Sequence, residues 1–206
     1  MLLKKTFFLY LIVVLQLEAK DLIKPIPLSI AYDKPKAILG KKLFFDTKLS
    51  KNNTISCASC HFLEDGGDDN IPVSFGIDGK AGKINSPTVY NAVFNFRQFW
   101  NGRAKNLEEQ AYGPITNRVE MGHNFQELVA DLKKDNKYQK EFGAIYKDGI
   151  TKKNIANAIA EYEKTLITPN APFDKYLRGD QNAITSKQKN GYRLFIQKGC
   201  IACHNG

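Results

Sequence analysis

The pattern Cys-x-x-Cys-His occurs twice in this 206-residue chain and uses all four of its cysteines and two of its three histidines. The two copies are Cys57-Ala58-Ser59-Cys60-His61 and Cys200-Ile201-Ala202-Cys203-His204. Two thiols three positions apart reach the two vinyl groups on one edge of a porphyrin, and the imidazole that follows them ligates the iron. The pattern therefore predicts two covalently bound c-type haems, attached through Cys57, Cys60, Cys200 and Cys203, with His61 and His204 as iron ligands.

Two simpler interpretations of the cysteines are a four-cysteine zinc site and a pair of short disulfides. Paired Cys-x-x-Cys motifs are also typical of structural zinc sites. Neither interpretation gives a reason for a histidine to follow both pairs directly. The haem interpretation explains both thiols and the histidine of each motif, so we favour it.

The segments around the motifs have mainly helical periodicity, and no run of alternating strands or internal repeat accompanies it. Four helices are expected. The first has an apolar face of Ala37, Ile38, Leu43, Phe44 and Phe45, and the second begins at Asn124 with Glu127 as a capping pair. The third begins at Thr151 and has apolar positions that continue to Leu166, ahead of Pro169, and the fourth extends from Thr185 to Gly199. Residues 66–106 have little periodicity and are expected to form a long functional loop region.

The haem motifs start 143 residues apart, at Cys57 and Cys200, which favours two small lobes over one large domain. The predicted fold is mainly α, with two cytochrome c-like haem lobes and long loops. Residues 1–19 have two lysines, an apolar run and a small residue at the end, as in a signal peptide for export to the periplasm. An uncleaved anchor is the alternative, but the run is shorter than the roughly 20 apolar residues that span a bilayer. The expected domains are 20–165 and 166–206.

The chain has 30 basic and 21 acidic residues; without residues 1–19, which contain Lys4, Lys5 and Glu18, 28 and 20 remain, a formal charge of +8. The lysines are dispersed, which is typical of a solvated surface and argues against a nucleic-acid partner. After removal of the signal peptide, no stable membrane insertion is expected. A docking patch for an acidic redox protein is the alternative use of this charge.

A series of short motifs follows the first Cys-x-x-Cys-His in a fixed order. These are Gly66-Gly67, Ser74-Phe75-Gly76, Asn85-Ser86-Pro87-Thr88-Val89-Tyr90-Asn91, Gln98-Phe99-Trp100-Asn101-Gly102-Arg103-Ala104, Leu107-Glu108-Glu109-Gln110-Ala111, Gly113-Pro114-Ile115 and Val119-Glu120-Met121. In this order they resemble the bacterial di-haem cytochrome c peroxidase family, which includes the methylamine-utilisation oxidases. The resemblance extends from about residue 25 to the end of the chain.

The resemblance implies that residues 20–165 hold the peroxidatic haem and that residues 166–206 begin an electron-transfer haem domain. It also implies Trp100 as an electron relay between the haems, Gln110 and Glu120 as the residues facing peroxide, and Asn85 as a calcium ligand. A positioned carboxylate such as Glu120 can move a proton from one peroxide oxygen to the other. Taken alone, Glu120 would be read as a surface ion pair or helix cap, and Trp100 as a core anchor. Arg103 is expected to be a structural or propionate partner.

The sequence departs from the family pattern at Ile77. The corresponding loop of typical members carries a histidine that caps the peroxidatic haem until the other haem is reduced, whereas this chain reads Ser74-Phe75-Gly76-Ile77. Isoleucine cannot ligate iron, so we expect a five-coordinate first haem that needs no activation. The third histidine, His123, is a candidate substitute ligand, but an ordinary surface or supporting role is the preferred interpretation.

Only Asn205 and Gly206 follow His204, whereas a further lobe follows in the family, so the second lobe is expected to be incomplete and the sequence truncated. The predicted function is a periplasmic peroxidase that reduces hydrogen peroxide with electrons from a small cytochrome c or cupredoxin, with a homodimer as a candidate assembly. One alternative is a methylamine-type oxidase that modifies a partner protein. The other is a non-enzymatic di-haem electron carrier, which would have no use for Glu120.

Overall fold

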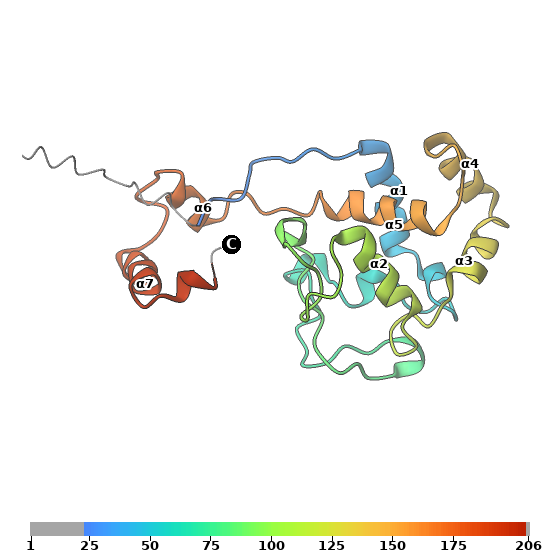
Figure 1. Cartoon of the computed structure of the whole chain (residues 1–206), viewed down its shortest axis with the longest axis horizontal. Helices are drawn as coiled ribbons and strands as arrows, with labels where there is room; N and C mark the ends of the chain where they lie inside the picture. The colour runs from blue at the N-terminus through green and yellow to red at the C-terminus, as the bar shows by residue number, and fades with distance from the viewer. Residues whose placement is uncertain (1–22, 205–206) are drawn as a thin grey trace, which may run out of the picture. The chain divides into compact units, whose positions relative to one another are not determined.

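Helices and short 3-10 turns make up the regular structure of residues 23–204, the part of the chain that the computed structural model describes (Figure 1). The α-helices are α1 (Lys34–Phe45), α2 (Leu107–Thr116), α3 (Phe125–Leu132), α4 (Asn136–Ile145), α5 (Lys152–Glu163), α6 (Pro172–Leu177) and α7 (Ser186–Gln197). The described residues contain only three isolated β-bridges and no strand. The prediction of a mainly α fold is confirmed, while the signal peptide expected at 1–19 lies outside the described residues.

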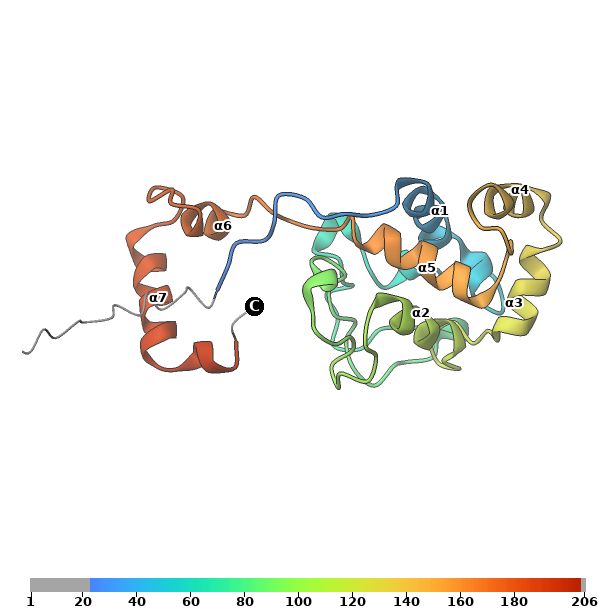
Figure 2. The ribbon, with the colours of Figure 1, turned by 45° about the horizontal axis from the view of Figure 1, so that its top comes forward.

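The chain divides into two compact units. The larger is residues 25–184, and the smaller contains α7 and the 3-10 turn η6 (Cys200–Ala202), which contact each other. In the larger unit α5 packs against α1 and α2, and α3 and α4 lie together at one end (Figure 2). Over residues 23–204, no helix is long and apolar enough to span a membrane. The domain bounds 20–165 and 166–206 remain a prediction.

The crossing of α1 and α5 forms the centre of the larger unit. Every residue of α5 from Asn154 to Glu163 is buried except Asn157, which is half-buried. The two helices approach so closely at Gly40 that a Cβ added there would lie 1.8 Å from the carbonyl oxygen of Ala158 and 2.9 Å from Cβ of Tyr162. Only glycine permits this approach, and the main hydrophobic core is built around it.

The helix starts follow the capping signals in the sequence. Asn124 accepts a hydrogen bond from the backbone N–H of Glu127 at 2.9 Å, and Thr151 accepts one from Asn154 at 3.1 Å. Thr185 and Gln188 form a reciprocal capping box at the start of α7. These side chains satisfy N–H groups that have no partner within the helix. The three predicted starts are confirmed.

Two details of the predicted helices were wrong. Ile38 and Phe45 were assigned to the apolar face of α1, but they are 64% and 48% exposed. The helix from Thr151 was expected to include Leu166, yet α5 ends at Glu163. Asn91 explains the early end, because its backbone N–H donates to the Leu166 carbonyl at 2.8 Å and its side chain binds Thr168. Leu166 is buried from a loop.

The loop region predicted at residues 66–106 is confirmed, since it contains only two 3-10 turns, η4 (Ile77–Gly79) and η5 (Ala92–Phe94). It ends at Asn106, whose side chain caps α2 by accepting a hydrogen bond from Glu109 N–H at 2.9 Å. A short backbone bridge between Gln98 and Ala104 holds its last turn. The loop thus has fixed anchors at the point where it meets a helix.

Substitution of Gly40 by alanine is predicted to destabilise the protein by about 1–3 kcal/mol, because the added methyl group forces α1 away from α5. Gly143→Ala in α4 is the matched control, since no atom lies within 4 Å of a Cβ at this exposed position. The control should gain about 0.5–1 kcal/mol from the higher helix propensity of alanine. Denaturant unfolding checks both values, and equal midpoints for the two variants would contradict the packing argument.

Candidate haem site

The first Cys-x-x-Cys-His motif begins with the 3-10 turn η2 (Cys57–Ser59). The N–H groups of Cys60 and His61 both donate to the carbonyl of Cys57, at 3.2 and 3.1 Å. Both cysteines are free and partly buried, and burial raises the pKa of each thiol, that of Cys57 to about 12. In the described part of the chain, no group of three or more His, Cys, Asp or Glu side chains is placed to hold a metal ion.

The imidazole of His61 is held by a hydrogen bond from its Nδ1 and by a ring contact. Its Nδ1 lies 3.1 Å from the carbonyl oxygen of Gly67, and its ring packs against Phe44 at 6.4 Å between centroids. Burial lowers the pKa of His61, which favours the neutral imidazole that binds metals. An Nδ1 that donates to a carbonyl fixes the tautomer and leaves Nε2 as the ligand atom, as in most protein haem and metal sites.

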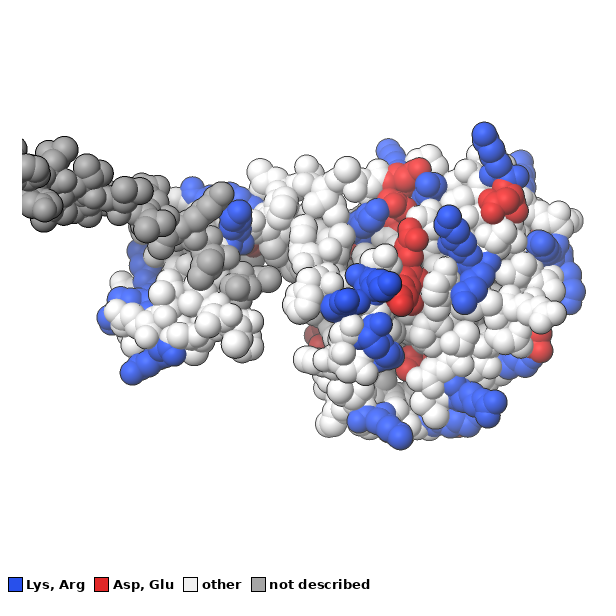
Figure 3. All heavy atoms as spheres, viewed as in Figure 1, with Lys and Arg blue, Asp and Glu red and all other residues white. Residues whose placement is uncertain are grey.

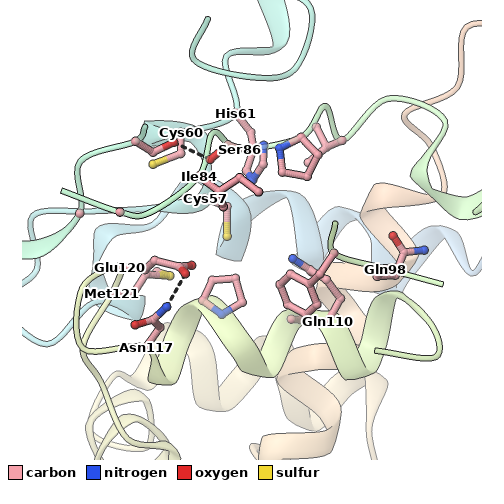
Figure 4. A pocket seen from close by; sticks show the side chains of 18 of the residues that line it. Cys57, Cys60, His61, Ile84, Ser86, Gln98, Gln110, Asn117, Glu120 and Met121 are labelled. Atoms are coloured by element: carbon pink, nitrogen blue, oxygen red, sulfur yellow. Dashed lines mark hydrogen bonds between the residues drawn. The ribbon is translucent and has the colours of Figure 1, made fainter. Parts of the chain in front are cut away.

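A cavity of about 670 Å³ lies against this motif. Cys57, Cys60 and His61 form one side of it, and Gln110, Asn117, Glu120 and Met121 lie on the opposite side (Figure 4). The remaining walls come from the loop region and from Ile159 and Glu163 of α5. This volume is in the range of cofactor cavities, and two thiols and an imidazole line one wall. The residues present therefore fit a covalently bound haem.

The wall opposite His61 is the end of α2 and the turn that follows it. Gln110 and Pro114 are four residues apart on α2, so they lie on the same face of the helix, and both line the cavity. After α2 the chain folds back, with Met121 N–H donating to Pro114 and both Glu120 and Gly122 N–H donating to Asn117 O. The carboxyl of Glu120 is thus held at the cavity by a tight backbone turn.

Glu120 has several partners. Its carbonyl accepts a hydrogen bond from Ile77 N–H at 2.7 Å, and Asn117 Nδ2 donates to its carboxylate. Burial raises the pKa of Glu120, while the hydrogen bond from Asn117 and the charge of Arg103 lower it to a smaller extent. A carboxyl group with a raised pKa in a cavity can exchange protons closer to neutral pH than a free glutamate.

Trp100 and Asn85 meet at the edge of the cavity. The indole Nε1 donates to the backbone carbonyl of Asn85 at 3.2 Å, and Trp100 is 63% exposed. It is therefore not the buried core anchor that a lone tryptophan usually is. Arg103 stacks on the ring of Phe99 at 3.4 Å and donates to Asn101 at 3.1 Å.

His123 lies outside the large cavity. It is buried, its Nδ1 accepts a hydrogen bond from Asn124 N–H at 2.9 Å, and it lines a separate hollow of about 220 Å³ with Lys48, Lys51 and Asp131. Ile77 is also absent from the cavity wall: its side chain packs next to Gly122, where an added Cβ would meet it at 3.2 Å.

The second motif has the same local geometry in the smaller unit. Cys203 and His204 N–H donate to the carbonyl of Cys200 at 3.3 and 3.0 Å, and the ring of Phe195 lies 6.4 Å from that of His204. Gly199, with φ of +78°, ends α7 and starts the turn. Cys200, Cys203 and His204 are exposed within the described residues.

Sequence reasoning missed two residues of the cavity, Asn117 and Glu163. Asn117 could have been suspected from its place three residues before Glu120. Glu163 follows Ile159 by four positions, so the predicted helix already placed it on the same face as an apolar residue. A buried carboxyl was not expected there because glutamate at the end of a helix is usually solvated.

Comparison with known proteins identifies the family. The sequence model of the family described as "Di-haem cytochrome c peroxidase" matches residues 34–182. This chain belongs to the di-haem cytochrome c peroxidase family. It is 49% identical to the cytochrome c peroxidase Ccp of Escherichia coli over 185 residues, which cover 89% of this chain and 40% of that protein. The resemblance inferred from the sequence motifs is confirmed.

Other relatives include both branches of the family. The cytochrome c551 peroxidase of Pseudomonas aeruginosa is 46% identical, over 92% of this chain and 57% of that one. The methylamine utilization protein MauG of Methylophilus methylotrophus is 36% identical, over 88% and 55%. The crystal structure of a MauG-like protein associated with microbial copper homeostasis superimposes with a TM-score of 0.77 at 28% identity, over 91% and 57%. This chain spans about half the length of the relatives it matches.

Proposed function

We propose that this protein is a periplasmic di-haem cytochrome c peroxidase, which reduces hydrogen peroxide to two water molecules with two protons and two electrons. The observation that carries this proposal is the cavity with Cys57, Cys60 and His61 on one side and Glu120 and Gln110 on the other (Figure 4). An electron carrier needs both axial positions filled and has no need of a carboxyl and an amide facing the iron. Membership of the family supports the same conclusion.

The first haem would be held by thioether bonds to Cys57 and Cys60, with Nε2 of His61 as the iron ligand. The second would be held in the same way by Cys200, Cys203 and His204. When bound, the first haem supplies the iron at which peroxide is reduced. The leader expected at 1–19 supports export to the periplasm, and a small cytochrome c or cupredoxin is the proposed electron donor. A homodimer remains the proposed assembly.

Glu120 and Gln110 are the proposed catalytic residues. With the haem bound, Glu120 would relay a proton from one peroxide oxygen to the other, while the electron donor and solvent would supply the two electrons and two protons that complete two water molecules. The hydrogen bond from Asn117 holds the carboxylate in place for this transfer. The side-chain amide of Gln110 orients the peroxide by hydrogen bonding, and a glutamine can do this at any pH because it does not titrate.

Trp100 is the proposed electron relay between the haems. Its position at the cavity edge and its hydrogen bond to Asn85 favour this role over a core anchor. Asn85 is the proposed calcium ligand. Its backbone carbonyl already accepts the Trp100 hydrogen bond, so its side-chain oxygen would bind the ion, which requires six to eight oxygen ligands in total.

Substitution of Glu120 by glutamine should leave haem content intact and lower peroxide turnover about 10²–10⁴-fold, the usual contribution of one positioned proton-transfer group. The ionised carboxylate is the form that accepts the proton, and burial raises its pKa above 4.5. Turnover of the wild type should therefore fall on the acid side with a midpoint above 4.5, and this limb should be absent in Glu120→Gln.

Steady-state rates across a pH series measure both effects. Glu127→Gln is the control, because Glu127 is an exposed glutamate that pairs with Lys51 on the surface. It should behave as the wild type. Undiminished turnover in Glu120→Gln would move the proton-transfer role to another group.

The Ile77 loop supports a first haem that is active without prior reduction. Gly76 packs so tightly that an added Cβ would lie 2.2 Å from the carbonyl oxygen of Val119, and Ile77 is tied to Glu120 by its N–H. The loop therefore has a fixed place, and Ile77 packs against Gly122 instead of lining the cavity. We propose that this loop would place no ligand on the iron of a bound first haem.

The ferric holoprotein is predicted to give a high-spin electron paramagnetic resonance signal from the first haem and to consume peroxide without a reductive lag. A spectrum of low-spin haems only, together with such a lag, would show that another ligand caps the iron. The variant Ile77→His tests the loop directly: it should produce a low-spin, activation-dependent enzyme if the loop can move to the iron.

A methylamine-type oxidase is the second candidate function, and Ile77 is the observation that favours it. The two functions differ in the source of the electrons that reduce peroxide. A peroxidase consumes two molecules of a one-electron donor per peroxide, whereas the oxidase takes electrons from side chains of a partner protein. Stopped-flow mixing of the holoprotein with peroxide and a reduced cytochrome distinguishes them by this stoichiometry.

The surface charge is the basis for a prediction about the donor. Figure 3 shows lysine and arginine side chains spread over the face in view, with acidic side chains among them. With an acidic donor, the second-order rate constant should fall as salt rises, because exposed charges are screened beyond about 10 Å at 0.1 M ionic strength. Turnover with acidic and basic donors across a salt series measures this. Rates with acidic donors that stay flat or rise would exclude steering by the basic surface.

A further inference from the structure

Glu163 is a buried carboxyl group in the wall of the haem cavity, and the proposed peroxidase mechanism does not use it. It is the last residue of α5, lines the cavity together with Ile159, and is 6% exposed. Its Oε2 is fully buried and has no hydrogen-bond partner in the described structure. An unpaired buried carboxylate is strongly unfavourable, so such a group binds a proton instead.

Glu161 on the same helix shows that burial alone does not produce this situation. It is 7% exposed, which is nearly the same as Glu163. Its two oxygens, however, accept hydrogen bonds from the backbone N–H of Asp33 at 2.7 Å and from Lys164 Nζ at 2.6 Å. Glu161 is thus satisfied as a charged carboxylate, whereas Oε2 of Glu163 has no hydrogen-bond partner in the described structure.

The titratable neighbours of Glu163 do not compensate its charge. Cys57 in η2 and Tyr162 on α5 lie near it. Burial raises the pKa of Cys57, and the charge of Glu163 raises it further. Burial also raises the pKa of Tyr162, with smaller contributions from Tyr90 and Glu163. His61, Glu120, Arg103 and Lys83 also line the cavity. Burial is the one cause that raises the pKa of Glu163, to about 8, and none of these groups contributes. Once Cys57 is a thioether it no longer titrates.

We propose that Glu163 is the proton-binding partner of the first haem, protonated when the iron is ferrous and ionised when it is ferric. As the iron receives one electron from the redox donor, Glu163 takes up one proton from solvent, and it releases that proton on reoxidation. The physical reason is that a ferric haem has one more positive charge than a ferrous haem and so favours an ionised carboxyl nearby. Reduction then leaves the net charge of the cavity unchanged.

The inference rests on the proposed haem site but not on peroxidase activity, so it can be tested in a protein that carries haem and reduces no peroxide. The expected signature is a midpoint potential of the first haem that falls as pH rises, because ionised Glu163 stabilises the ferric state. The limit for a one-electron couple is about 59 mV per pH unit, which corresponds to a tenfold change in proton binding. The second haem serves as an internal reference.

Spectroelectrochemical titration of the full-length holoprotein should show this slope in the wild type and at least a twofold smaller slope in Glu163→Gln. Glu161→Gln is the matched control, because Glu161 lies on the same helix with nearly the same burial but is paired, and it should keep the slope. An unchanged slope in Glu163→Gln, or an equal loss of slope in Glu161→Gln, would overturn the assignment to Glu163. Failure to bind haem in the wild type would overturn the proposed haem site and this inference together.

A second measurement covers the case in which Glu163→Gln does not fold. Infrared difference spectra of the wild-type holoprotein should show the C=O stretch of a protonated carboxyl group appearing on reduction of the first haem. The band should move in Glu163→Asp, which keeps the carboxyl but changes its surroundings. The absence of such a band in the wild type would overturn the proposal regardless of the behaviour of the variants.

Discussion

The close crossing of α1 and α5 at Gly40 determines where the parts of the haem cavity lie. Phe44 lies in the last turn of α1, and its ring contacts both His61 and Tyr162. The helix pair therefore supports the imidazole. α5 continues from the crossing to Ile159 and Glu163 in the cavity wall. A shift of either helix would therefore move His61 relative to the opposite wall. Catalysis of proton transfer depends on distances of this kind to within a fraction of an ångström.

Local signals in the sequence predicted the parts of the structure that depend on local interactions. The side-chain oxygens of Asn124, Thr151 and Thr185 accept hydrogen bonds from N–H groups in the first turn of their helices. The long segment without periodicity is a loop region. The end of α5 was not predictable in this way. It is set by Asn91, which lies more than seventy positions away in the sequence and binds Leu166 and Thr168 through backbone and side-chain hydrogen bonds.

The site shows the same division between local and distant determinants. Residue types and spacing were sufficient to select the cysteines and histidines, and family motifs selected Glu120, Gln110 and Trp100. The hydrogen bond between Trp100 and Asn85 and the environment of Glu163 arise from tertiary packing. The pair between Glu161 and Lys164 is local and could be suggested by the sequence. The hydrogen bond from Asp33, well over a hundred residues earlier, and the lack of a partner for Oε2 of Glu163 could not.

The two haem motifs illustrate how much chemistry depends on what surrounds an identical local structure. In both, two N–H groups donate to the first cysteine carbonyl and a phenylalanine ring lies 6.4 Å from the histidine ring. These features place the thiols and the imidazole of each motif for attachment of a haem and ligation of its iron. Redox potential and reactivity depend on burial, nearby charge and the group opposite the histidine. At the first motif these are a cavity lined by Glu120 and Glu163. In the proposed function, one carboxyl would serve peroxide and the other would answer the charge of the iron.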